Sequence, residues 1–151
     1  RAAASRAGAE SVISKSEAPH GGWQFPVEVP ENVGTIQALM DELIALPEAQ
    51  RPTGLFAAAD SVAVLVYRAL ATRGLAVGQD FSLVSGNHDT ALIAGLHPTL
   101  TTSDVDALAI GQHAVRQLAA RVASPEYAVD TEIFLKPRLV KGESVRVQTQ
   151  R

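Results

Sequence analysis

Two groups of polar residues follow two short apolar runs, and they are the first candidates for chemistry. Asp60 comes just after the run 53–58, and Asn87, His88 and Asp89 follow the run 81–85. Parallel sheets bind ligands outside the carboxyl ends of their strands, so we expect both groups to lie on one rim and face one ligand. Each group also has a purely structural interpretation. Asp60 could cap the helix that follows it, and the triplet could be a turn held by side-chain hydrogen bonds.

Other kinds of site find little support in the sequence. The histidines show neither the i, i+4 spacing of a zinc-protease helix nor any paired ligand motif, so we expect no metal site. Ser85 lacks the glycine frame of a serine hydrolase, and no glycine-rich phosphate loop is present. The absence of cysteine excludes disulfides, thiolate metal sites and cysteine nucleophiles. We therefore expect neither an enzyme nor a bound cofactor.

The composition is that of a folded domain with a slightly acidic surface. Of the 151 residues, 46% are hydrophobic and 19% are charged, which excludes an intrinsically disordered chain. A net charge of −3 argues against a surface that neutralises nucleic-acid phosphates. The apolar runs are too short to span a bilayer and no signal peptide is visible, so we expect a cytoplasmic protein without a membrane partner. A processed periplasmic protein stays open as an alternative.

Helix and strand patterns alternate along the chain, which predicts an α/β fold with a mainly parallel sheet and right-handed crossovers. Apolar residues at helical spacing predict a helix over 36–44, a second from Asp60 to Gly74, and a third from a capping box at Ser103 to Val122. Short apolar runs predict buried strands at 53–58 and 81–85. Weaker signals predict a helix over 1–13 and strands at 23–29, 128–135 and 138–140.

Several segments, in order and with conserved spacing, resemble the lactose/galactose-repressor (LacI/GalR) family of transcription regulators. They extend from Arg51 to Ser144, about two-thirds of the chain. The matching segments are RPTGLFAAAD (51–60), GLAVGQDFSLV (74–84), GNHD (86–89), HPTLTT (97–102), the helix 109–118 and KPRLVKGES (136–144). Each motif alone is weak, but their common register makes the resemblance specific.

The resemblance implies the C-terminal half of a periplasmic-binding-protein-like effector domain, a three-layer α/β/α fold. Residues 1–100 and 128–145 would form the C-terminal lobe, and the helix 103–123 would pack on an N-terminal lobe that is absent from this chain. The start at Arg1, without methionine, favours such a partial domain. Proteins of this family are dimers that bind a small molecule, often a sugar, between two lobes. They bind operator DNA through an N-terminal helix-turn-helix, which this chain also lacks.

The same resemblance implies which residues would contact the effector. Arg1 would meet a ligand hydroxyl or anionic group, and His88 and Asp89 occupy the two positions of the family's acidic pair. Trp23 or Phe25 would stack on the apolar face of a sugar, although core packing is the simpler interpretation of both. Ala59 stands where the family often has a ligand-contacting asparagine, and His88 replaces an aspartate, so we expect an effector other than a simple galactoside.

A dimer interface is expected on the loop 90–96 and on the helix that begins near Ser61. The apolar cluster in that loop consists of Ala91, Leu92, Ile93 and Leu96. Burial of the same side chains within the monomer is the alternative. For the whole protein, a periplasmic sugar-binding protein of the same fold remains the competing interpretation, and an unrelated α/β enzyme is disfavoured because no catalytic motif is present.

Overall fold

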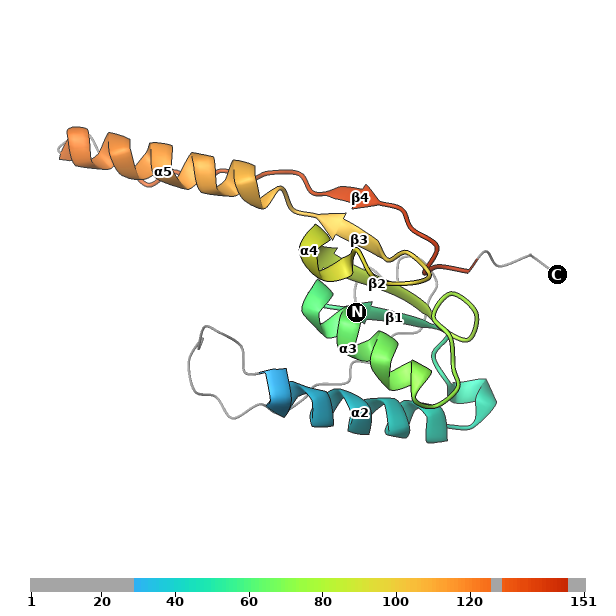
Figure 1. Cartoon of the computed structure of the whole chain (residues 1–151). Coiled ribbons are helices and arrows are strands. Elements are labelled where there is room, and N and C mark those ends of the chain that lie inside the picture. The colour runs from blue at the N-terminus through green and yellow to red at the C-terminus, as the bar shows by residue number, and fades with distance from the viewer. Residues whose placement is uncertain (1–28, 126–128, 147–151) are drawn as a thin grey trace.

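The computed structural model describes residues 29–125 and 129–146 (Figure 1). Its elements, in chain order, are α2 (Val29–Ala45), a 3-10 turn (Glu48–Gln50), β1 (Gly54–Ala57), α3 (Asp60–Ala71), β2 (Ser82–Asn87), α4 (Thr90–Ile93), β3 (Thr101–Asp104), α5 (Ala107–Ala123) and β4 (Arg138–Val140). The helices predicted over 36–44 and from Asp60, and the strands predicted at 53–58, 81–85 and 138–140, are confirmed with small shifts of their ends.

The predictions for the first part of the chain fall mostly outside the described residues. This holds for the helix over 1–13 and for Arg1, Trp23 and Phe25. The strand predicted over 23–29 does not extend to Val29, because Val29 is the first residue of α2. The apolar positions of α2 recur at helical rather than alternating spacing, which accounts for the earlier start of the helix.

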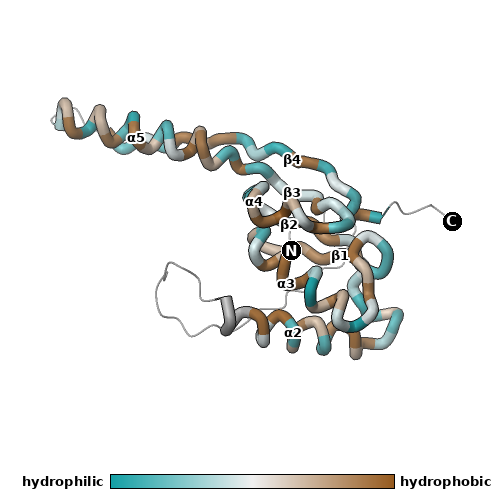
Figure 2. The backbone as a smooth tube through the Cα atoms, viewed as in Figure 1, coloured by the Kyte–Doolittle hydropathy of each residue, from teal (hydrophilic) through white to brown (hydrophobic). Residues whose placement is uncertain are grey.

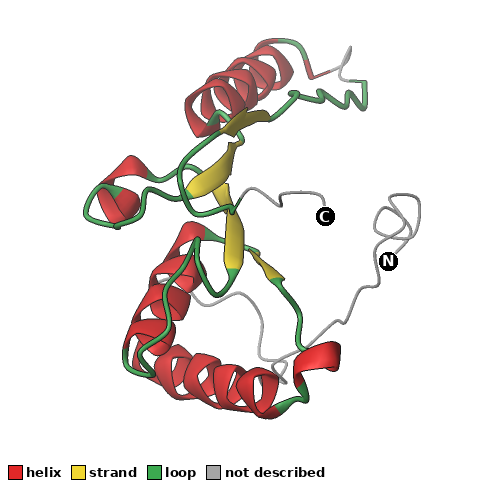
Figure 3. Cartoon of the chain, turned by 90° about the vertical axis from the view of Figure 1, so that its right-hand side faces the viewer, coloured by secondary structure: helices red, strands yellow, loops and turns green. Residues whose placement is uncertain are grey.

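The described strands form one mixed sheet in the order β1-β2-β3-β4. β1, β2 and β3 are mutually parallel, and β4 is antiparallel to β3. Helix α3 lies against β1 and β2, and α2 packs on α3 (Figure 3). The arrangement confirms the predicted α/β class with a mainly parallel sheet and flanking helices.

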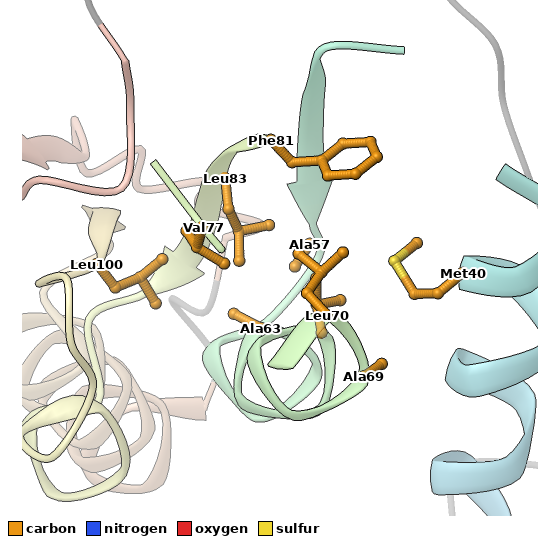
Figure 4. Packing of buried hydrophobic residues seen from close by; sticks show 10 residues of the cluster. Met40, Ala57, Ala63, Ala69, Leu70, Val77, Phe81, Leu83 and Leu100 are labelled. Carbon is orange, nitrogen blue, oxygen red and sulfur yellow. The ribbon is translucent and has the colours of Figure 1, made fainter. Parts of the chain in front are cut away.

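The core lies between α3 and one face of the sheet. Leu70 of α3 and Leu83 of β2 are fully buried, and Met40 reaches this cluster from α2 (Figure 4). Side chains alternate along a strand, so Ala57 of β1 is buried, whereas Phe56 next to it is 73% exposed on the other face. Burial of one face fixes the register of the strands, and with it the position of their carboxyl ends.

Beyond β3 the chain leaves the sheet as an extension that we call the outer arm, defined as residues 105–125 and 129–137. Figure 1 shows α5 projecting away from the sheet, with the returning chain beside it. No residue of α5 is buried, although Figure 2 shows apolar positions along it. The strand predicted at 128–135 is wrong for its described residues, 129–135, which form no regular element. Most of them are exposed, and no described strand lies beside them with which they could form a ladder.

The start of α5 also differs from the prediction. Ser103 does not open the helix; residues 101–104 form β3, and Asp106 caps α5 by accepting a hydrogen bond from the Ala109 amide at 3.0 Å. The physical reason is long-range, because the Thr101 amide donates to Ser144 Oγ at 2.8 Å and so holds this segment in the sheet.

A final segment, residues 142–146, closes the amino ends of β2 and β3. Ser144 is fully buried between them: its hydroxyl donates to the Leu83 carbonyl at 2.6 Å, and its carbonyl accepts from the Leu83 amide at 2.8 Å. Gly142 lies so close to the backbone before β3 that an added Cβ would be 2.7 Å from the Leu100 carbonyl carbon. Within the described residues, no helix combines the length and apolar character needed to cross a bilayer.

Candidate functional site

The carboxyl ends of β1, β2 and β3 are joined by the carboxylate of Asp60. This side chain is only 1% exposed. Its Oδ1 accepts hydrogen bonds from the Ser85 hydroxyl and, at 2.9 Å, from the Thr102 hydroxyl, and its Oδ2 accepts from the Asp89 amide at 2.5 Å. A buried carboxylate requires such partners, since an unpaired one is costly. Asp60 therefore holds three strand ends at one rim, and its oxygens point inward.

The predicted capping role of Asp60 is wrong. Asp60 is the first residue of α3, Ala59 occupies the cap position, and no side chain caps this helix end. The Asp60 carboxylate instead accepts hydrogen bonds from the hydroxyl groups of the neighbouring strands and from the Asp89 amide. As for effector contact, the burial of Asp60 places its carboxylate behind the rim rather than on its surface.

The turn after β2 has an unusual backbone. Asn87 and His88 both have positive φ values, 99° and 58°, which non-glycine residues rarely adopt. Two buried side chains hold the backbone of the turn. The His88 amide donates to the Thr102 hydroxyl at 3.3 Å, and the Asp89 amide donates to the Asp60 carboxylate. The alternative of a turn fixed by side-chain hydrogen bonds is thus confirmed, and the same turn brings the three polar side chains to the rim.

The two side chains expected to contact the effector occupy different environments. His88 is partly exposed, and its Nδ1 is buried without a hydrogen-bond partner among the described residues. Asp89 is exposed and caps α4, because its Oδ1 accepts from the Ala91 amide at 3.1 Å. The prediction that Asp60, His88 and Asp89 lie close together is thus confirmed. The Asp60 carboxylate points inward, and His88 and Asp89 lie on the rim.

Asp104 and Arg138 extend the same rim across the sheet. Asp104 lies opposite Asn87 in the β2–β3 register and opposite Arg138 in the β3–β4 register. Its Oδ2 accepts from Arg138 Nη2 at 3.0 Å, and its Oδ1 accepts from the Asp106 amide at 2.9 Å. The Asp106 amide, the Arg138 guanidinium and the positive potential of His88 lower the pKa of the Asp104 carboxyl, against the opposing effect of desolvation.

Sequence reasoning missed the residues that support the rim. Ser85 is a hydroxyl residue within a strand predicted to be buried, and this placement is the signal that could have found it. Thr102 is also fully buried, but it lies in a short polar strand that carries no such signal. Asp104 lies in a segment that the sequence predicts as a capping box, because its strand is short and polar. Within the described residues, no group of three or more histidine, aspartate or glutamate side chains is arranged so that it could hold a metal ion.

The four apolar residues expected at a dimer interface divide into two pairs. Ala91 and Leu92 of α4 are exposed, with Leu92 48% exposed. Ile93 and Leu96 are partly buried and pack against the core cluster of the same chain. The exposed pair is available to a partner, whereas the other pair already has contacts within the monomer.

Comparisons with known proteins agree with this architecture. A family model described as a periplasmic binding protein-like domain matches residues 2–145. The ribose operon repressor of Haemophilus influenzae is 34% identical over 100 residues, which are 66% of this chain and 30% of that protein. A LacI family transcriptional regulator from Enterococcus faecium, solved with bound ribose, has a TM-score of 0.65 and 25% identity, covering 76% of this chain and 40% of the other.

The lac repressor dimer, solved bound to operator and the anti-inducer ONPF, has a TM-score of 0.62 and 29% identity, covering 77% of this chain and 37% of the repressor. The chain thus spans less than half of each of these three proteins. All three are named as transcription regulators, and none of them as an enzyme. Because the family model covers nearly the whole sequence, we conclude that the chain belongs to the periplasmic binding protein-like domain family, in the form carried by LacI-type regulators.

Proposed function

We propose that this chain is the C-terminal lobe of the effector-binding domain of a LacI-type transcription regulator. The rim around His88 and Asp89 would take one side of a sugar or sugar derivative, and the second lobe would close over the other side. The relatives support this assignment, since one is named for a ribose operon and another was solved with ribose. The position of the rim at the carboxyl ends of parallel strands supports it independently.

The observation that carries the proposal is the turn of Asn87 and His88. Two successive non-glycine residues with positive φ cost free energy, and such conformations persist only where surrounding contacts enforce them, commonly at ligand sites. Here the enforcing contacts come from Asp60 and Thr102. They present a partly exposed histidine ring at the rim, and such a ring can donate a hydrogen bond to a ligand hydroxyl or accept one from it.

The remaining candidates take distinct roles in this proposal. Asp60 acts by holding the Asp89 amide and not by touching the effector, because its carboxylate is buried. Arg1 would bind a hydroxyl or anionic group of the effector, and Trp23 or Phe25 would stack on a sugar ring. With Ala59 and His88 replacing an amide and a carboxylate of the family pattern, the effector differs from a simple galactoside.

In the whole protein, we further propose a cytoplasmic homodimer that binds operator DNA through an upstream helix-turn-helix. Ala91 and Leu92 would contribute to the dimer interface. The apolar side chains of the outer arm would pack on the N-terminal lobe, since they are too numerous to remain in water: Leu108, Ile110, Val115, Leu118, Val122, Ile133 and Phe134 are all exposed here. Of these, Ile110, Ile133 and Phe134 line an open groove of about 510 Å³ between α5 and residues 131–137.

A binding experiment on the full-length regulator tests the assignment. D-ribose, D-galactose, cellobiose and their phosphates are screened by thermal shift, because a ligand that binds the folded state raises the melting temperature. For the sugar that binds, His88→Ala should weaken binding measured by calorimetry by about 1–3 kcal/mol, the cost of an unpaired polar group.

His97→Ala serves as the matched control, because His97 is an exposed histidine on a loop away from the rim. It should bind the sugar as the wild type does. An unchanged affinity of His88→Ala would remove His88 from the site. A full-length protein that binds no operator DNA and no sugar would contradict the assignment as a whole, and a signal peptide upstream of Arg1 would replace it with a transport function.

A further inference from the structure

The outer arm is joined to the sheet by two crossings of the chain that lie side by side. The chain leaves the sheet after Asp104 and returns to it at Arg138, and these two residues are register partners in the β3–β4 pair. Helix α5 makes no extensive contact with another described helix or strand, and none of its residues is buried. Within the described part of the chain, the outer arm and the sheet are therefore joined mainly at the two crossings.

One carboxylate holds both crossings. Asp104 Oδ1 accepts from the Asp106 amide at 2.9 Å, which fixes the turn leading out to α5. Asp104 Oδ2 accepts from Arg138 Nη2 at 3.0 Å, which fixes the first residue of the returning strand. The turn needs this support, because Asp106 has a φ of 54°.

We propose that the Asp104–Arg138 ion pair is a latch that sets the angle of the outer arm relative to the sheet. Exposed ion pairs contribute little to global stability, and the Arg138 side chain is 78% exposed. The arm, however, has few other contacts with the sheet, so a small energy difference is enough to decide its orientation. Asp104 also lies opposite Asn87, so the latch adjoins the rim where we place the effector.

Two substitutions separate the latch from the turn. Asp104→Asn keeps an oxygen for the Asp106 amide but loses the charge that attracts Arg138. Arg138→Gln removes the guanidinium and leaves the Asp104 turn intact. Arg138→Lys keeps a positive charge at the same place. The control is Arg121→Gln, which breaks a comparable pair within the outer arm, since Arg121 Nη2 lies 3.4 Å from Asp130 Oδ1.

The arm angle is measured by distances between two spin labels on the 151-residue chain. The sequence contains no cysteine, so Arg68→Cys on α3 and Gln112→Cys on α5, both at exposed positions, give uniquely placed labels. Wild type, Arg138→Lys and Arg121→Gln should give the same narrow distance distribution. Arg138→Gln and Asp104→Asn should both broaden it, with melting temperatures unchanged. Wild type in ~1 M salt, where charges are screened beyond ~3 Å, should broaden as well.

Distributions of Arg138→Gln and Asp104→Asn that match the wild type would overturn the proposal. So would a broadening of equal size in Arg121→Gln, which would show a general effect of surface charge, or an equal broadening in Arg138→Lys. None of these measurements requires an effector, so failure of the latch and failure of the proposed function are distinguishable.

Discussion

At the scale of single residues, the rim depends on how Asp60 uses its two oxygens. Oδ1 serves the hydroxyls of Ser85 and Thr102, and Oδ2 serves the Asp89 amide. A hydroxyl donor can rotate toward an acceptor, but a backbone amide cannot. The hydrogen bond from the Asp89 amide to Oδ2 therefore has the strictest geometric requirement of the three. It fixes the backbone between His88 and α4, and thereby the direction of two candidate effector contacts.

We predict that Asp60→Asn destabilises the chain and disturbs the rim. The asparagine oxygen can still accept from Ser85 and Thr102, but its NH₂ group would then face the Asp89 amide, which places two donors together. The cost should be about 1–3 kcal/mol in the free energy of unfolding, measured with urea. Asp80→Asn is the control, since the exposed Asp80 side chain accepts from the Ala76 amide and an asparagine oxygen can do the same. Equal stabilities of the two variants would refute this account.

At the scale of elements, the amino ends of β2 and β3 are completed by residues 142–146. Ser144 contributes hydrogen bonds to both strands, and Gly142 passes the backbone before β3 at a distance that excludes a side chain. The segment adds no regular element of its own, yet it satisfies backbone groups that burial would otherwise leave unpaired.

Gly142→Ala should therefore destabilise the fold by about 1–3 kcal/mol, the range for overpacking of a tight site. The added Cβ would contact the Thr99 carbonyl oxygen and lie 2.7 Å from the Leu100 carbonyl group. Gly95→Ala provides the comparison, because a Cβ at Gly95 would meet nothing within 4 Å. Thermal unfolding of both variants checks the prediction, and similar melting temperatures would count against the close approach.

Some elements can be predicted from the sequence and others cannot. The sequence separation of the contacts that hold each element explains the difference. Helices α2 and α3 and strands β1 and β2 carry local apolar patterns, so periodicity alone places them. Strand β3 is four residues of Thr, Ser and Asp, and it is a strand because Ser144 and Asp60 bind it from 43 and 42 positions away. Topology alone brings Asp60 and His88 to one edge, but the inward direction of the Asp60 carboxylate depends on the Ser85 and Thr102 hydroxyls.

At the scale of the whole molecule, two of the surfaces that described residues leave uncovered bear on the proposed partners. One is the outer arm, which we assign to the N-terminal lobe. The other is the exposed part of α4, which extends from the side of α3 and carries Leu92. A solved relative of this chain, the lac repressor, is a dimer, and an interface at α4 of this chain stays a prediction.

Leu92→Glu should weaken dimerisation of the full-length protein. A charge at the centre of an apolar interface typically costs about 2 kcal/mol or more, roughly a 30-fold rise in the dimer dissociation constant. Sedimentation equilibrium measures this constant, with Gln79→Glu as a control that adds the same charge at an exposed loop position. A dimer as tight as that of the wild type would place the interface elsewhere.

The closure of the sheet by Ser144 has a consequence for biosynthesis. Leu83 leaves the ribosome 61 residues before Ser144, which at ~5–20 residues per second corresponds to roughly 3–12 s of translation. During that interval the Leu83 amide and carbonyl lack their final partners, and the edge they form is open to any extended segment nearby. The nascent lobe is therefore most open to chaperones, and to mispairing with other nascent chains, until residues 142–146 emerge.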